Sequence, residues 1–432
     1  MRILYVADGH SPIARGWIES IGALGHEVAL ITTHPCAPLE GDVPIFEALI
    51  GLSGLLRRAS SVAAGGSGGA GAAPAPAAAR PPGVLSRLVR GRVAMALRGS
   101  RWGLAAIDLF RHRERCRRRI REFAPDLVHG MRLTFEGALA AMSTPQGTPL
   151  LVSVWGNEFT LHARSGAPVR KIIRRTLERA DGLLADCRRD TRLARDEWGF
   201  EGSTLAVLPG GGGIDVGRFH PAAPNREKLR ALGIPDDADV LINPRGVRSY
   251  VCNEAFYRAI PAVLAERPNL WVLAAGTADS PQVHGWTRSL GIEQRVVRLP
   301  VVAQAEMADL FRLARITVSP SLHDGTPNSL LEAMACGCFP VAGDIESVRE
   351  WIADGENGLL CDPQEPSQIA AAILRALGDE ELRAEARARN LRLVYERAER
   401  TSVMAEVTDL YDELATRGAS VRVRGESLAL GL

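Results

Sequence analysis

Short apolar segments that alternate with amphipathic segments constrain the fold of this chain more than any other feature. The first apolar run, 2–7, is broken by Asp8-Gly9-His10-Ser11-Pro12 and followed by an amphipathic stretch, 13–24, and a second apolar run, 27–32. Strand, glycine turn, helix and strand in this order are typical of a βαβ unit in a parallel sheet. Four further strands are expected in the first half, over 126–129, 149–154, 182–185 and 204–208.

A second series of the same kind begins after a glycine cluster at 210–213, which we interpret as a hinge followed by a linker. Its strands are expected over 240–243, 270–274, 296–299, 316–319 and 339–342. A chain of 432 residues with 46% apolar residues is large enough to bury two cores. We therefore predict two Rossmann-like α/β domains with parallel sheets, and a ligand held between them at the carboxyl ends of the strands.

Charge and cysteine content exclude several other classes of protein. The 52 basic and 50 acidic residues give a net charge of +2, so there is no global reason to expect a nucleic-acid partner. The seven cysteines form no CxxC pair and no zinc-ligand spacing, which favours reduced thiols in a cytoplasmic protein and predicts no metal site. We find no export signal at the first residues and no window of ~18–20 apolar residues that would span a bilayer.

The segment 319–337, SPSLHDGTPNSLLEAMACG, carries the clearest chemistry. A strand is expected to end at Ser319, and a helix to begin near Thr326 with Pro327 in its first turn. The backbone N–H groups from Gly325 to Ser329 would then be unpaired at a helix N-terminus, where a diphosphate can dock.

Two carboxylates flank this helix start. Asp324 precedes it and is expected to meet a sugar, whereas Glu332 lies further inside the helix on the same side and is expected to bind ribose hydroxyls. The residues alone also allow a simpler interpretation, in which Asp324 merely caps a core helix.

The spacing of the two acids resembles the signature of glycosyltransferase family 4, the group 1 retaining transferases. Their pattern has two glutamates separated by seven residues in S-x-x-E-G-x-x-x-x-x-x-E-A-M-A-x-G, and Asp324 stands here for the first glutamate. Three other stretches resemble the same family in the same order: 208–221, 341–360, and 8–12 with 25–28.

The resemblance implies a GT-B fold with the following domains. The first domain is expected over 1–221 and the second, which binds the nucleotide sugar, over 222–395. A helix over 396–418 is expected to return to the first domain, and 419–432 to form a tail. Within the first domain, 63–83 is rich in Ala, Gly and Pro and is predicted to be a flexible loop, and 84–122 a basic amphipathic segment.

The resemblance also implies which residues bind the donor. The family holds the diphosphate with an arginine and a lysine after the first strand of the second domain; here Arg245 and Arg248 are the candidates, and Cys252 stands about where the lysine is expected. We assign Arg245, Arg248 and Asp324 to catalysis. The remaining donor-binding candidates are Gly9, Gly276, Thr277, Pro300, Val301, Val302, Gly325, Thr326, Pro327, Asn328, Ser329 and Glu332.

Candidates on the acceptor side come from the loops of the first domain. They are His10, His129, Trp155, Asn157 and Glu158. Many relatives carry a histidine near Trp155, and this chain does not, so a histidine base is not supported there. The alternatives are that His129 caps its strand and that Glu158 is a surface acid.

The basic segment 84–122 holds twelve arginines and three acids, interleaved with apolar residues. Such a surface would attract anionic lipid or a lipid-diphosphate acceptor, at ~1 kcal/mol for each well-placed arginine. The alternative is a solvated arginine-rich helix.

The function implied by the resemblance is transfer of a sugar from a nucleotide diphosphate sugar, UDP or GDP, to an acceptor hydroxyl with retention at the anomeric carbon. No cofactor or metal is implied, and the leaving diphosphate helps to deprotonate the hydroxyl. Two alternatives remain open: a nucleotide-sugar epimerase with the same architecture, and a non-catalytic subunit that binds a nucleotide sugar.

Overall fold

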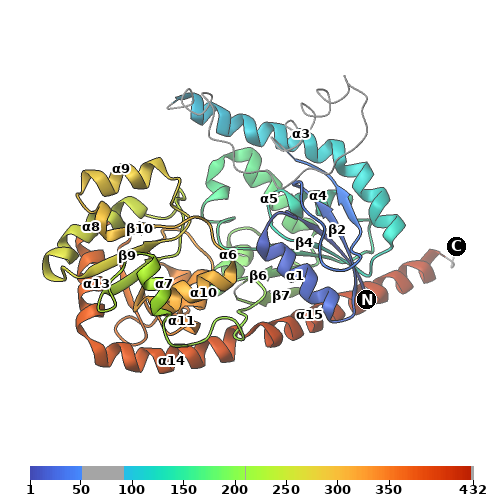
Figure 1. Ribbon diagram of the computed structural model, residues 1–432. Helices are drawn as coiled ribbons and strands as arrows, with labels where there is room; N and C mark the ends of the chain where they lie inside the picture. The colour runs from blue at the N-terminus through green and yellow to red at the C-terminus, as the bar shows by residue number, and fades with distance from the viewer. Residues whose placement is uncertain (51–91, 210, 430–432) are drawn as a thin grey trace, which may run out of the picture.

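The computed structural model describes residues 1–50, 92–209 and 211–429. Two parallel sheets, each covered by helices on both faces, form two α/β domains (Figure 1). The first sheet has seven strands in the order β3-β2-β1-β4-β5-β6-β7, and the second has six in the order β10-β9-β8-β11-β12-β13. The predicted fold class, two Rossmann-like parallel-sheet domains, is confirmed.

The elements of the first domain are β1 (Arg2–Ala7), α1 (Pro12–Ala23), β2 (Glu27–Thr32), β3 (Ile45–Glu47), α3 (Arg92–Phe123), β4 (Leu127–Gly130), α4 (Glu136–Ser143), β5 (Leu150–Val154), η2 (His162–Ser165), α5 (Ala167–Arg179), β6 (Gly182–Ala185), α6 (Arg188–Asp196) and β7 (Thr204–Val207). The predicted loop over 63–83 and the start of the basic segment, 84–91, lie outside the described residues.

The elements of the second domain are α7 (Arg226–Ala231), β8 (Asp239–Asn243), α8 (Asn253–Glu266), β9 (Leu270–Ala274), α9 (Pro281–Ser289), η3 (Glu293–Arg295), β10 (Val296–Arg298), α10 (Gln304–Leu313), β11 (Ile316–Ser319), α11 (Asn328–Ala335), β12 (Phe339–Gly343), α12 (Glu346–Arg349), β13 (Leu359–Cys361), α13 (Pro366–Gly378) and α14 (Glu380–Ala398). A final helix, α15, covers Arg400–Ala429.

The central strands are buried along their whole length because helices cover both faces of each sheet. In β1 every residue from Ile3 to Ala7 is 0% exposed, and β5 and β11 are likewise buried throughout. Continuous apolar runs, rather than alternating ones, are the sequence signature of such strands. This is why the sequence predicts these strands well.

Helices α14 and α15, red in Figure 1, connect the second domain to the first. The Tyr411 hydroxyl on α15 accepts a hydrogen bond from Trp17 Nε1 at 2.9 Å and bonds to His129 Nδ1 at 2.8 Å. The helix therefore packs into the core of the first domain. It continues as a helix to Ala429, past the point where the sequence predicts a tail.

The glycine segment between the domains lies beside the junction of α14 and α15. Gly211, Gly212 and Gly213 have φ angles of 54°, 106° and 82°, which favour glycine. Ile214 bonds through its N–H to Ala398 O at 2.7 Å and through its carbonyl to Arg400 N at 3.0 Å. Both connections between the domains thus run side by side, an arrangement suited to a hinge.

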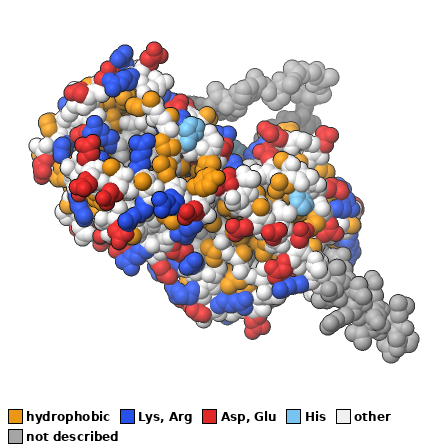
Figure 2. Space-filling model, turned by 90° about the horizontal axis from the view of Figure 1, so that it is seen from below, with side chains coloured by type: hydrophobic (Ala, Val, Ile, Leu, Met, Phe, Trp, Pro, Cys, Tyr) orange, Lys and Arg blue, Asp and Glu red, His pale blue; other side chains and the backbone are white. Residues whose placement is uncertain are grey.

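No described helix combines the length and the apolar character needed to cross a bilayer. Acidic and basic side chains are interspersed over the face seen in Figure 2, in keeping with the small net charge.

Candidate functional site

The start of helix α11 lies at the boundary between the two domains. The helix begins at Asn328, with Pro327 in the capping position rather than in the first turn as predicted. Among the described residues, the backbone N–H groups of Gly325, Thr326, Asn328 and Ser329 donate to no protein acceptor. We call these four groups the mouth of α11. They form a partial positive charge that suits an anion.

Asp324, at the edge of the mouth, forms an ion pair with Arg245 from the loop after β8. The distance between Arg245 Nη1 and Asp324 Oδ2 is 2.8 Å, and the side chains are only 13% and 10% exposed. Burial disfavours the guanidinium charge, but Asp324 and Tyr250 together outweigh this effect and raise the pKa of Arg245. Arg245 also lies over the ring of Tyr250, 5.8 Å from its centre. Asp324 therefore does more than cap a helix, because its carboxylate is held by a charged partner from another loop.

The first domain closes directly over the mouth. Gly156, in the loop after β5, has a φ of 83°, and a Cβ built there would lie 1.9 Å from Gly325 N. A Cβ on Gly325 would lie 2.2 Å from both carboxylate oxygens of Asp186, at the end of β6. Only glycine fits at either position. A sugar diphosphate enters this contact only if the two domains move apart.

Four carboxylates gather around this contact: Asp186, Asp190, Glu158 and Asp324. Burial, followed by the charges of Asp190, Glu158 and Asp324, raises the pKa of Asp186 well above its usual value. One oxygen of Asp186 is buried without a hydrogen-bond partner among the described residues. Burial and the neighbouring carboxylates therefore favour the protonated form of Asp186.

Asp186, Cys187 and Asp190 lie close enough to resemble a cation site. Arg189 already neutralises Asp190 at 2.9 Å, and burial raises the pKa of the Cys187 thiol, which disfavours the thiolate that binds metals. These residues do not fit a metal ion.

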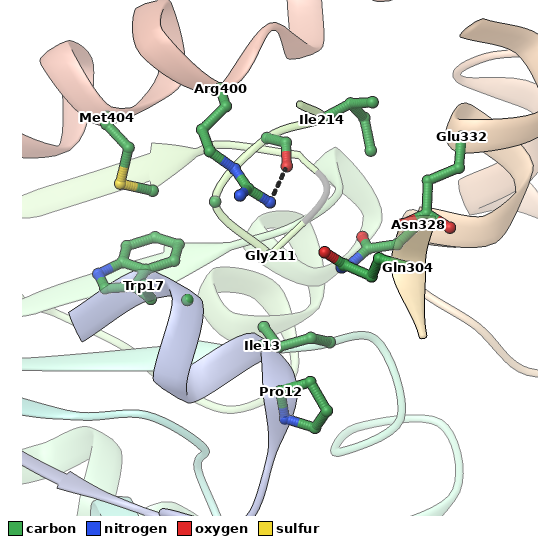
Figure 3. Close-up of a pocket in the computed structure, with 13 residues that line it drawn as sticks. Pro12, Ile13, Trp17, Gly211, Ile214, Gln304, Asn328, Glu332, Arg400 and Met404 are labelled. Carbon is green, nitrogen blue, oxygen red and sulfur yellow. Dashed lines mark hydrogen bonds between the residues drawn. The ribbon is translucent and has the colours of Figure 1, made fainter. Parts of the chain in front are cut away.

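Glu332 lines a small pocket at the same domain boundary (Figure 3). The cavity is about 30 Å³, and Glu332 lines it together with Trp17, Asn328, Arg400 and the glycines 211–213. Burial raises the pKa of Glu332 to about 7, although the charges of Arg400 and Arg218 act in the opposite direction. Ligand pockets measure roughly 300–1,000 Å³, so this one holds no nucleotide unless the domains open.

The other donor-binding candidates of the second domain lie at the carboxyl ends of its strands. Gly276 (φ 68°) and Thr277 close β9 and donate backbone hydrogen bonds to Pro300 O and Leu299 O. Val301 is 89% exposed. Arg248, in contrast to Arg245, is exposed and forms no described ion pair. The predicted sites are thus brought to one edge of the second sheet.

The acceptor-side candidates divide into two groups. His129 is fully buried: Tyr411 and Ser153 occupy both of its ring nitrogens at 2.8 and 2.7 Å, and burial lowers its pKa to about 3. The prediction of His129 as an acceptor-side residue is wrong, because it is part of the core. His10 is exposed on the loop after β1, beside Gly9, whose N–H donates to Thr32.

Trp155, Asn157 and Glu158 form the loop that closes on the mouth. The buried Glu158 carboxylate accepts hydrogen bonds from Trp155 N and Asn157 N, both at 3.1 Å, and lies 3.7 Å from Arg132. Glu158 is therefore not a surface acid. Its bonds shape the loop, and Asn157 Oδ1 is buried with no described partner.

The residues predicted from the sequence did not include Gly156, Asp186 or Arg189. A signal existed, because Asp186-Cys187-Arg188-Arg189-Asp190 is a polar run directly after a buried strand, where parallel sheets place their ligands.

Comparisons with known proteins match both halves of the chain. The family described as "Glycosyl transferases group 1" matches residues 225–392, and "Glycosyl transferase 4-like domain" matches residues 8–211. The D-inositol 3-phosphate glycosyltransferase of Kineococcus radiotolerans is 32% identical over 233 residues, 49% of this chain and 53% of that protein. The chain thus spans about half the length of the curated relatives it matches.

Two solved structures show the same fold over nearly the whole chain. Sucrose-phosphate synthase from Thermosynechococcus elongatus has a TM-score of 0.71 at 16% identity, covering 96% of this chain and 100% of that chain. Anabaena HepE in complex with UDP-glucose has a TM-score of 0.69 at 15% identity, covering 96% and 100%.

Proposed function

Because this chain belongs to the group 1 glycosyltransferases, we propose that it transfers a sugar from a nucleotide diphosphate sugar to an acceptor hydroxyl, with retention at the anomeric carbon. The observation that carries this proposal is the mouth of α11, with its four unpaired N–H groups beside the Asp324–Arg245 pair, placed between the two domains. The HepE structure contains UDP-glucose, which favours UDP as the first donor to test and GDP as the second.

The residues divide the work as follows. The mouth and Arg245 stabilise the charge that develops on the leaving diphosphate, and Asp324 orients the sugar. Glu332 accepts hydrogen bonds from the ribose in its ionised form. The leaving diphosphate takes the proton of the acceptor hydroxyl. In this scheme the residues of the site do not have to hold a metal ion. Closure of Gly156 over the mouth excludes water and limits hydrolysis of the donor.

The acceptor is proposed to be lipid-linked and the protein to work in the cytoplasm, bound to the inner face of a membrane. Helix α3 supports this: Ile107 and Phe110 are 65% and 64% exposed, one turn apart on a helix rich in arginine. Two exposed apolar side chains among cations are suited to the headgroup region of an anionic bilayer. Sedimentation with phosphatidylglycerol vesicles, but not with phosphatidylcholine vesicles, tests this point.

The decisive experiment is incubation of the pure protein with radiolabelled UDP, GDP and ADP sugars, with and without a lipid extract. Nucleotide release that depends on acceptor supports transfer, and an α-linked product supports retention. An isomerised sugar would instead indicate an epimerase.

One alternative function has its own support. A non-catalytic protein that binds a nucleotide sugar is favoured by the direct contact of Gly156 with Gly325, by the missing N–H of Pro327 and by Cys252 in place of the family lysine. Tight binding of donor without turnover under any acceptor condition would support this alternative.

A further inference from the structure

Arg189, the second residue of α6, connects the two domains at the candidate site. Its guanidinium donates a hydrogen bond to the carbonyl of Asp324 in the second domain at 2.8 Å and to the carbonyl of Gly156 in the first at 2.7 Å. It also donates to Ser347 Oγ at 3.3 Å. The side chain is 7% exposed, so these contacts are shielded from water.

The surrounding groups hold Arg189 in this place. Asp190 accepts from Arg189 Nε at 3.0 Å and balances its charge. The backbone N–H groups of Arg188 and Arg189 donate to the Glu350 carboxylate of the second domain at 2.9 and 3.2 Å. Ser347 Oγ donates to Asp324 O at 2.7 Å, so this carbonyl accepts two hydrogen bonds when the domains are closed.

We infer that Arg189 is a positioning residue that couples domain closure to the placement of Asp324. The inference rests on the proposed function, because it assigns Asp324 to the donor sugar. Arg189 is not expected to contact the diphosphate, since its donors are taken by Asp190 and by the carbonyls of both loops. When the domains separate, the bond to Asp324 O breaks and the Asp324 loop loses its contact with the first domain.

Arg192 provides a matched control on the same helix. It forms an ion pair with Glu346 across the same boundary at 2.9 Å, but both side chains are about half exposed and neither contacts Asp324. Loss of this pair removes a contact between the domains without touching the Asp324 loop.

The test uses the full chain with Arg189→Met/Asp190→Asn, which removes the guanidinium without leaving the Asp190 charge buried and unpaired. Asp190→Asn alone keeps the guanidinium, so it separates the effect of losing the guanidinium from the effect of neutralising Asp190. Arg192→Met is the control. We expect the double variant to lower kcat about 100-fold, as a misplacement of roughly 1 Å does, with the donor KM changed by less than about threefold. Both other variants should stay within about threefold of the wild type in kcat.

Amide hydrogen exchange of the free protein gives a readout that needs no substrate. The double variant should exchange faster than the wild type in peptides covering 321–327, by more than in peptides remote from the domain boundary, and Arg192→Met should not. If the double variant matches Arg192→Met in both kcat and exchange, the inference is wrong. A wild type without turnover refutes the proposed function alone, because the exchange comparison still decides whether Arg189 holds the loop.

Discussion

Replacing Glu332 by glutamine tests the protonation of the Glu332 carboxyl group, which lines the pocket at the domain boundary. Burial raises the pKa of Glu332 to about 7 from an ordinary value of 4.5. At about 1.4 kcal/mol per tenfold change in proton affinity, this difference corresponds to about 3 kcal/mol. Between these two pH values the folded chain keeps the proton that the unfolded chain has released. The free energy of unfolding therefore falls as the pH rises from 4.5 to 7.

Glu332→Gln keeps the size of the side chain and removes this pH-dependent fall in the free energy of unfolding. At pH 5 we expect the variant and the wild type to be about equally stable, whereas at pH 8 the variant should be more stable by about 3 kcal/mol. For a domain of this size that corresponds to a thermal midpoint roughly 6–12 °C higher. Thermal unfolding at pH 5, 6.5 and 8 measures the difference, with the exposed Glu266→Gln as the control.

Binding of a nucleoside diphosphate should change in the opposite direction. The ionised carboxylate is the form that accepts ribose hydroxyls, so wild-type affinity should increase as the pH rises through 7. Glu332→Gln should remove this pH dependence and weaken binding at pH 8 by about 10–100-fold, the range of a hydrogen bond to a charged group. A stability difference that does not vary with pH, or unchanged nucleotide affinity at pH 8, would contradict the role proposed for Glu332.

Three other substitutions test the remaining parts of the site. Asp324→Asn should lower turnover about 100-fold, with a much smaller effect on nucleotide affinity; full activity would remove Asp324 from catalysis. Gly156→Ala should lower turnover because its methyl group overlaps Gly325 when the domains close. Gly199→Ala, also at positive φ but with free space around it, should not lower turnover. Equal kinetics of the two variants would argue against closure. His129→Ala should lower the thermal midpoint but not the turnover of the folded protein, and a selective loss of turnover would return it to the acceptor site.

Most of the fold is predictable from the sequence because central parallel strands are continuous apolar runs. The predicted strands 182–185, 270–274 and 316–319 match β6, β9 and β11 residue for residue. The strands β3 and β13 were not predicted. Each has three residues at the edge of its sheet, and strands this short give only a weak sequence signal, although β10, of the same length and also at an edge, was predicted as 296–299.

The site is less predictable, because a sequence pattern does not show which loops meet across two domains. The mouth of α11 follows from local rules for helix ends, and Arg245 from a resemblance in one loop. The contact of Gly325 with Gly156 joins residues far apart in the chain, and no local signal indicates it. His129 was assigned to the wrong environment because its two partners, Ser153 and Tyr411, come from another strand and from the last helix.

The mouth of α11 is proposed to bind the pyrophosphate of a nucleotide sugar between the two domains. A crystal structure of the protein with an intact UDP or GDP sugar tests this proposal. We predict phosphate oxygens within hydrogen-bond distance of the N–H groups of Gly325 to Ser329 and the sugar against Asp324, with the two domains closed over the donor. A pyrophosphate bound elsewhere, with no phosphate oxygen near these N–H groups, would contradict this proposal.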